Sequence, residues 1–170
     1  VLDFVCQAPA PTALYPLSLH AAPPILELGQ DDPRKCTARR LARMGLAHSY
    51  GSPARLPPRG IALDPFAERE LVEADAELAQ VGGLVGVDCS WNRAPETFAS
   101  LRLHGLEPRR LPPLVPANPV NAGKVGKLTT AEALAGALAV LGEEEHAAQL
   151  MGAFKWGPAF LALNFGAAAL

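Results

Sequence analysis

The sequence predicts an α/β fold in its first two thirds and an all-helical segment in its last third. Three observations support this. Apolar runs of strand length, GLVGV above all, are typical of parallel strands buried on both faces. Polar, helix-like stretches separate the runs, and strands that alternate with helices form parallel sheets. From residue 128 onward the pattern is helical throughout. We therefore expect a parallel sheet within residues 24–112 and a helical lobe over residues 113–170.

Size and composition indicate an ordinary globular protein. The chain has 170 residues, enough for one domain with a full core or for two small lobes that share an interface. No apolar run approaches the roughly 18–20 residues of a membrane helix. Cys6, Cys36 and Cys89 form no CxxC pair, and the histidines are scattered. We expect a reducing compartment, no disulfide framework and no metal site.

The N-terminal third begins with a segment of no clear period. Residues 1–23 are predicted to form an irregular arm, and LYPLSLHAAPPI resembles translated adaptor sequence, so we expect the natural start to lie nearer residue 24. ILELG is the first predicted strand. A basic helix follows within QDDPRKCTARRLARMGLAH, with Asp31 or Asp32 as its cap and Pro33 in its first turn.

The middle of the chain carries the next two strands. Prolines 53, 57 and 58 break the chain, and IALDP is the second predicted strand. FAERELVEADAELAQ is predicted to be an acidic helical or capped segment, and GLVGVDCS to be the third strand.

The last part changes from extended to helical. Prolines in LEPRRLPPLVPANPV exclude a helix and leave room for one or two short strands. In LTTAEALAGALAVLG, Thr129 or Thr130 can cap, Glu132 lies near N3, and leucines recur at helical spacing. EEEHAAQLMGAF and PAFLALNF continue the helical pattern.

Polar clusters follow the predicted strands at four places. They are DDPRKCT, LDP, DCSW and ANPVNAGKVGKLTT. Each alone fits a turn with a helix cap. Open α/β sheets bind ligands at the carboxyl ends of their strands, so in a parallel sheet all four clusters would converge on one rim.

Basic residues occupy two segments of the chain, with an acidic segment between them. The first holds Arg34, Lys35, Arg39, Arg40, Arg43, Arg55 and Arg59, and the second holds Arg93, Arg102, Arg109, Arg110, Lys124 and Lys127. If the two segments meet, they form one positive face suited to a phosphate backbone. Otherwise they are two solvated faces.

Six stretches in order give the sequence a family resemblance. DDPRKCTARRLAR, ALDP, DCSW, RRLPPLVPANPVNAG, KLTTAEALAGAL and FKWGPAFLALN resemble the small-subunit rRNA aminocarboxypropyltransferases over about residues 25–165. The resemblance implies transfer of the 3-amino-3-carboxypropyl group of S-adenosylmethionine to N3 of an N1-methylpseudouridine, or of a uridine, in small-subunit rRNA, with methylthioadenosine as the other product. It also implies a SPOUT-like deep trefoil knot in the sheet, with residues 24–112 as the cofactor-binding lobe. The protein is further expected to be a cytoplasmic monomer that acts in ribosome maturation.

Site residues follow from the same resemblance. The resemblance implies that the pocket around the sulfonium methyl is formed by Leu63, Pro65, Trp91 and Ala94. It implies that backbone groups of Leu111 and Gly126 recognise the adenine. It also implies that the hydroxyls of Thr37 and Thr130 lie near the amino acid moiety of the donor. Asp88 lies beside the reacting centre, where it can accept the N3 proton or only bond to backbone or ribose. Contacts to rRNA phosphates are expected from Lys35, Arg39, Arg40, Arg43, Arg59, Arg93, Arg109, Arg110 and Lys124.

Departures from the family pattern keep two alternatives open. Pro113, Pro116, Ala122 and Gly126 replace the aliphatic, small, tyrosine and aromatic residues that are usual there. One alternative is a SPOUT-like RNA methyltransferase, which would need an exposed methyl. The other is a catalytically inactive assembly factor that binds pre-rRNA. In FKWG the two aromatic residues are expected to pack in the core, with only the lysine near RNA.

Overall fold

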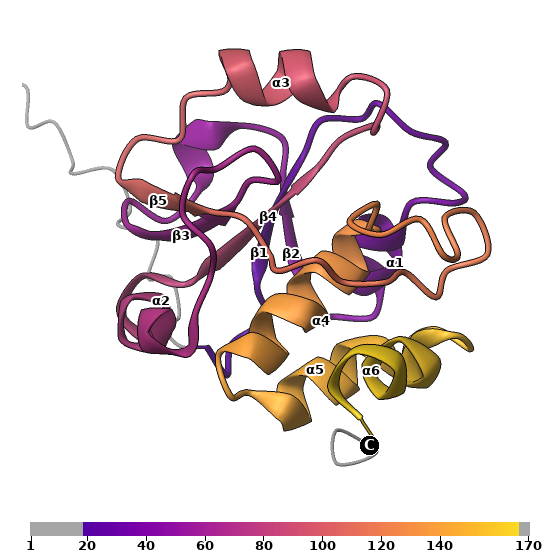
Figure 1. Ribbon diagram of the computed structural model, residues 1–170. Coiled ribbons are helices and arrows are strands. Elements are labelled where there is room, and N and C mark those ends of the chain that lie inside the picture. The colour runs from indigo at the N-terminus through magenta and orange to yellow at the C-terminus, as the bar shows by residue number, and fades with distance from the viewer. Residues whose placement is uncertain (1–18, 167–170) are drawn as a thin grey trace, which may run out of the picture.

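The computed structural model describes residues 19–166, and within them five strands form one parallel sheet (Figure 1). The strands are β1 (Pro24–Glu27), β2 (His48–Tyr50), β3 (Gly60–Leu63), β4 (Leu84–Asp88) and β5 (Leu106–Arg109). Their order across the sheet is β2-β1-β4-β3-β5. The parallel sheet and its three predicted strands are confirmed. The predicted arm lies outside the described residues as far as residue 18.

Helices pack on one face of the sheet and form a further layer below it (Figure 1). They are α1 (Thr37–Arg43), α2 (Ala76–Gly82), α3 (Ala94–Ser100), α4 (Thr130–Val140), α5 (Glu144–Met151) and α6 (Gly157–Phe165), with short 3-10 helices η1 (Pro53–Arg55) and η2 (Glu73–Asp75). α4 packs on β4 and α1, and α5 packs on α4 and α6. No helix within the described range is long and apolar enough to span a membrane.

Alternating side chains divide the core into two clusters. Ile25 and Ile61 belong to the larger cluster, which also contains residues of α1, α2 and α4 to α6. Leu26 and Val85 belong to the smaller cluster on the opposite face. Because neighbouring residues of one strand fall in different clusters, the sheet is buried on both sides, as the continuous apolar run predicted.

Gly86 permits the close approach of α4 to the sheet. A Cβ at this position would lie 3.2 Å from Cδ2 of Leu134 in α4. That is tighter than ordinary van der Waals contact, so a larger residue would push the helix away from β4. The glycine therefore helps to hold the start of α4 against the end of β4.

Helix beginnings agree with the sequence prediction at α4 and differ at α1. Thr129 and Glu132 form the predicted capping box of α4. The predicted cap of the basic helix is wrong, because Cys36 is the N-cap of α1 and its Sγ accepts from the Arg39 amide. Asp32 instead closes a turn, in which its Oδ1 accepts the Arg34 amide at 3.0 Å. That turn also takes Pro33 out of the helix.

Three elements differ from the prediction. β2 and α3 were not expected, and residues 66–72 of the predicted acidic helix are not helical. β2 is a three-residue edge strand of mixed polarity, too short to show a period. Before the helical part, the Asp64 side chain accepts the Phe66 amide at 2.8 Å and so favours a turn.

The sheet has its topological switch point between β1 and β4. β1 continues through α1 to β2 on one side, whereas β4 continues through α3 to β5 on the other side. Glu27 and Asp88, the last residues of the two strands, are register partners. Connections that diverge in this way leave a crevice at the carboxyl ends, which is where open α/β sheets bind ligands.

Candidate functional site

A cavity of about 950 Å³ opens at the carboxyl ends of β1, β3, β4 and β5. Its lining includes residues from all four polar clusters, for example Asp32, Pro65, Trp91 and Gly126. The predicted convergence of these clusters on one rim is therefore confirmed. The volume lies at the upper end of the roughly 300–1,000 Å³ that is common for ligand sites.

Asp88 is at the floor of this cavity. It ends β4 and is 7% exposed. Its Oδ1 accepts the Thr130 hydroxyl at 2.6 Å, and its Oδ2 accepts the Cys36 thiol at 3.2 Å. The carboxylate thus joins the N-terminal ends of α1 and α4 to the end of β4, and each of its oxygens has a neutral donor.

Asp31 supplies a second carboxyl group to the cavity lining. Burial and the nearby charge of Asp88 raise its pKa, while a hydrogen bond with the Ser90 side chain acts in the opposite direction. The Ser90 amide donates to Oε1 of Gln30 at 3.2 Å, which fixes the β1 loop against the β4 loop. The carboxyl groups of Asp31 and Asp88 are therefore close enough for the charge of Asp88 to affect the pKa of Asp31.

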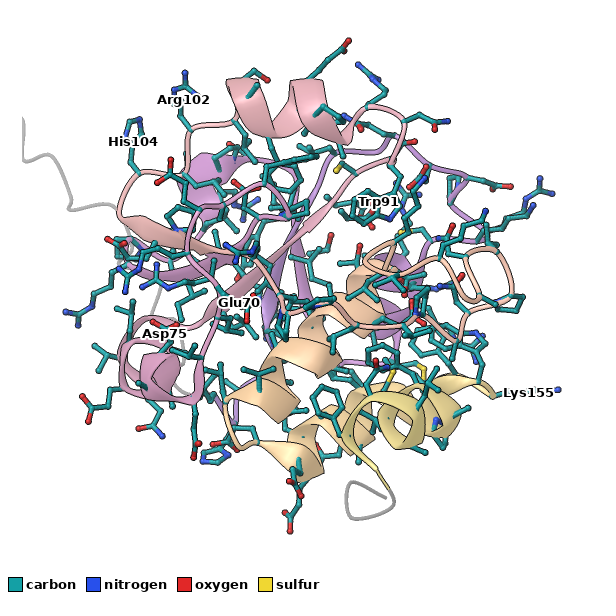
Figure 2. All side chains as sticks on the ribbon, in the orientation of Figure 1. Glu70, Asp75, Trp91, Arg102, His104 and Lys155 are labelled. Carbon is teal, nitrogen blue, oxygen red and sulfur yellow. The ribbon has the colours of Figure 1, made fainter. Side chains whose placement is uncertain are left out.

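Trp91 forms part of the apolar wall. Its Nε1 donates to the Leu128 carbonyl at 2.9 Å, which fixes the indole against the segment that precedes α4. Leu63, Pro65 and Ala94 line the same cavity. Figure 2 shows Trp91 between α3 and the beginning of α4. An indole held in this way offers a face suited to a cation.

Thr37 and Thr130 begin the two helices next to Asp88. Thr37 Oγ1 accepts the Ala131 amide at 3.3 Å, so the first turns of α1 and α4 are in direct contact. Both threonines line the cavity. The Thr130 hydroxyl donates to Asp88, so both helix beginnings are tied to the cavity floor.

Glu132 anchors the segment between β5 and α4, a role that the sequence prediction missed. The side chain is fully buried and accepts the amides of Ala117 at 2.8 Å, Asn118 at 3.0 Å and Thr129 at 2.9 Å. It also accepts the Asn118 side-chain amide at 2.7 Å and the Thr129 hydroxyl at 3.0 Å. The capping-box spacing indicated only the Thr129 contacts. The contacts with Ala117 and Asn118 join residues 15 and 14 positions apart.

Gly126 has a backbone conformation that suits glycine. Its φ is +79°, in the left-handed region that an aromatic residue rarely adopts. Its amide donates to the Leu114 carbonyl at 2.8 Å. Leu111 and Gly126 both line the cavity. The departure from the family pattern at Gly126 is therefore accompanied by a local conformation that tolerates it.

The predicted phosphate-binding residues fall into two groups, those with exposed side chains and those engaged in ion pairs. Lys35 and Lys124, one from each basic segment, are exposed and line the cavity, so the two segments do meet there. Four other predicted cations, Arg40, Arg43, Arg59 and Arg93, are exposed and lie outside the lining. The guanidinium of Arg40 also lies 5.3 Å from the Phe154 ring centroid.

Three other predicted cations are engaged in ion pairs. Arg39 binds Glu27, and Arg110 binds Glu70 at 3.3 Å. Arg109 is 3% exposed and donates to both oxygens of Asp75 at 3.1–3.2 Å. The burial of Arg109 contradicts its predicted contact with RNA phosphates, because the guanidinium is committed to a buried carboxylate.

Two thiols adjoin the cavity floor. Burial, and to a lesser extent the charge of Asp88, raises the pKa of both Cys36 and Cys89 to about 11. Both thiols are therefore protonated near neutral pH and are poor nucleophiles.

The FKWG segment packs as predicted. Phe154 is buried, and its ring stacks on Trp156 with centroids 4.8 Å apart. Lys155 is exposed and lies at the edge of the helical layer, well away from Trp91 (Figure 2).

Two protein-family models match the chain. Residues 61–168 match the C-terminal domain of ribosome biogenesis proteins. Residues 25–52 match a possible Fer4-like domain described in RNase L inhibitor. Iron–sulfur clusters are held by several thiolates, and this segment contains Cys36 alone, so the second match does not bring the ligands of a cluster.

Curated relatives and a solved structure resemble most of the chain. A 16S rRNA aminocarboxypropyltransferase from Methanosarcina acetivorans is 45% identical over 140 residues, which are 82% of this chain and 79% of that protein. One from Halobacterium salinarum is 49% identical over 136 residues, which are 80% of this chain and 78% of that protein. The SAM-dependent rRNA acp-transferase Tsr3 from Vulcanisaeta distributa is 40% identical with a TM-score of 0.78, covering 82% of this chain and 77% of that one.

Proposed function

Because the chain belongs to the family of 16S rRNA aminocarboxypropyltransferases, we propose that it transfers the 3-amino-3-carboxypropyl group of S-adenosylmethionine to small-subunit rRNA. One observation carries the proposal. Every residue that the family resemblance assigns to the donor or to the chemistry lines the same cavity: Thr37, Leu63, Pro65, Asp88, Trp91, Ala94, Leu111, Gly126 and Thr130.

The cavity lining fits the parts of the donor. S-adenosylmethionine supplies a sulfonium with three electrophilic carbons attached. We propose that Trp91 and its apolar neighbours enclose the methyl, so that the aminocarboxypropyl arm is the one presented to the acceptor. For the adenine edge we propose the Gly126 carbonyl, since the amide of this residue is already bonded to Leu114. Thr37 and Thr130 would face the amino acid moiety.

The transfer is a direct displacement. The acceptor N3 bonds to the Cγ of the donor as the Cγ–S bond breaks, and the electron pair of that bond stays on the sulfur of methylthioadenosine. We propose N3 of an N1-methylpseudouridine or uridine as the acceptor and Asp88 as the carboxylate that takes its proton. The protonated Cys36 and Cys89 have no role as nucleophiles in this scheme.

The rRNA is proposed to enter over the exposed cations around the cavity. Lys35 and Lys124 on the lining are supported by Arg40 and Arg93 farther out. Arg59 precedes β3 and Arg43 ends α1, so these two cations lie toward the opposite end of the strands from the cavity and would contact more distant parts of the RNA. Phosphate contacts of this kind fix the register of the RNA, while the cavity selects the base. Since the family acts in ribosome maturation, we propose a cytoplasmic enzyme, active as a monomer.

For the chain topology we propose the SPOUT-like deep trefoil knot. The strand order β2-β1-β4-β3-β5 supports it, together with the long segment between β5 and α4, which passes in front of the strands in the view of Figure 1. We further propose that residues 24–112 and 113–170 are two lobes that unfold together. The larger core cluster contains residues of both, which supports a single transition.

Differential labelling of the donor tests the activity. The protein is incubated with small-subunit rRNA that lacks the aminocarboxypropyl group and contains uridine or, separately, N1-methylpseudouridine as the acceptor. S-adenosylmethionine carries its label in the carboxyl group or, separately, in the methyl group. We expect carboxyl label in the RNA and methylthioadenosine in solution. Methyl label in the RNA would instead identify a methyltransferase. Donor binding without transfer would identify an inactive assembly factor, and no donor binding would overturn the assignment of the cavity.

A further inference from the structure

Two aromatic rings meet beside the mouth of the cavity. Phe66, in the loop after β3, and Phe98, in α3, contact each other edge to face, with centroids 5.8 Å apart and planes at 60°. Phe66 is 52% exposed, and Phe98 is half-buried and lines the cavity. The two rings therefore form a continuous apolar surface that begins inside the cavity and ends in solvent.

This pair has no structural role in the core. Neither ring belongs to either core cluster of the described residues. Phe66 directly follows Pro65, and Phe98 lies one helical turn after Ala94, so each ring adjoins a residue of the proposed donor pocket. A contiguous apolar surface that continues from a ligand cavity to the solvent is a candidate contact for a ligand.

We propose that Phe66 and Phe98 form the stacking subsite for the pyrimidine base that receives the aminocarboxypropyl group. The inference rests on the proposed function, and it names where the acceptor is held. An N3 atom takes part in base pairing, so the nucleotide must leave any duplex before N3 can reach a donor in the cavity. Unpaired bases bind proteins largely by stacking on aromatic side chains.

Charge and volume at the cavity agree with a nucleotide. Arg93, the N-cap of α3, is exposed five residues before Phe98, and Lys124 and Lys127 line the cavity. These cations can contact phosphates on either side of an extruded base. The volume of about 950 Å³ is large for a single ligand, which leaves space for a base beside the donor.

Substitution of both rings tests the subsite. In Phe66→Leu/Phe98→Leu, apolar volume is retained and stacking is lost. We expect the Kd and the KM for a small-subunit rRNA transcript to rise about 5- to 150-fold, the range for one stacked base, while the Kd for S-adenosylmethionine stays unchanged. The single variant Phe98→Tyr retains an aromatic face, so it should bind the RNA with the affinity of the wild-type protein. Phe165→Leu in α6 is the matched control.

The outcomes separate this inference from the proposed function. Unchanged RNA affinity in the double variant would overturn the subsite, and so would an equal loss of affinity for S-adenosylmethionine, which would place the rings in the donor pocket. RNA affinity is measured without turnover. Absence of transfer by the wild-type protein would therefore overturn the proposed function, while the binding data would still decide whether the rings hold a base.

Discussion

The Thr130 hydroxyl donates a 2.6 Å hydrogen bond to Oδ1 of Asp88, which ties the first residue of α4 to the last residue of β4. The two residues are 42 positions apart. Their contact brings the helical segment to the floor of the cavity. Because Cys36 of the α1 N-cap bonds to the other oxygen of Asp88, one carboxylate organises three elements of the site.

Thr130→Val should damage both the site and the fold. The substitution keeps the shape but leaves a buried carboxylate oxygen without its donor, which costs about 1–3 kcal/mol. We expect this loss in the free energy of unfolding, measured by denaturant titration, together with a lower kcat for transfer. Thr130→Ser keeps a hydroxyl and should preserve most of both. Equal damage by the serine variant would show that the hydrogen bond is not the cause.

Trp91→Phe tests the hydrogen bond of the indole N–H, because phenylalanine keeps an aromatic ring but has no N–H group. Loss of the 2.9 Å bond to Leu128 frees the ring to tilt, and a neutral hydrogen bond of this kind contributes about 0.5–1.5 kcal/mol. We expect a roughly 2- to 10-fold rise in the Kd for S-adenosylmethionine by calorimetry, and a larger rise for Trp91→Ala. Trp156→Phe, which alters a tryptophan stacked on Phe154, is the control and should bind normally. A donor Kd unaffected by Trp91→Ala would remove this residue from the donor pocket.

Glu132→Gln should loosen the segment between β5 and α4. Glutamine replaces one acceptor oxygen by a donor, which then faces the Asn118 or Thr129 groups that also donate. We expect a loss of about 1–3 kcal/mol in the free energy of unfolding and faster hydrogen exchange at the Ala117 and Asn118 amides. Glu145→Gln, at an exposed position in α5, should change neither. Unaltered exchange at both amides would contradict the anchoring role.

Alkylation of the thiols should be slow at neutral pH. With a pKa of about 11, Cys36 and Cys89 have far less thiolate at pH 7 than a free cysteine of pKa near 8.5, so we expect iodoacetamide to react roughly 300-fold more slowly. Cys36→Ser retains a cap for α1 and a donor to Asp88 and, like Cys89→Ser, should retain transfer. Loss of transfer in either serine variant that still folds and binds the donor would argue for a covalent step.

Much of the site could be predicted from the sequence because its residues occur in short, local clusters. Each cluster follows a strand, and a parallel sheet brings the ends of such strands together whatever the strand order. Trp91 and Asp88 could therefore be placed in one cavity before their contacts were known. The capping box at Thr129 and Glu132 was equally local.

The parts that could not be predicted depend on distant partners. The sequence does not show that Glu132 holds Ala117, or that Asp75 pairs with Arg109, which lies 34 residues away. The family resemblance and the charge pattern made Arg109 a candidate for RNA binding, yet burial opposite a carboxylate gives it a structural role. The short edge strand β2 likewise exists through its pairing with β1 and not through its own pattern.

The pair of Asp75 and Arg109 should make stability depend on acid pH. Burial alone would raise the pKa of Asp75, but hydrogen bonds from Arg109 and from the Val72 amide hold it below its usual value. A lowered pKa in the folded state contributes stability above the unfolded pKa of about 3.9, and this contribution is lost as the pH falls through the folded pKa.

Asp75→Asn removes that contribution and leaves the Arg109 charge buried, so we expect a loss of about 3–5 kcal/mol in the free energy of unfolding at pH 7. Denaturant titrations from pH 7 down to pH 3 should show the difference between wild type and variant narrowing below about pH 4, because the Asp75 carboxylate of the unfolded wild-type chain takes up a proton there while that of the folded protein stays ionised to lower pH. Glu77→Gln, at an exposed position in α2, provides the comparison and should follow the wild-type curve. A gap that stays constant over this range would mean that the charge of Asp75 does not stabilise the fold.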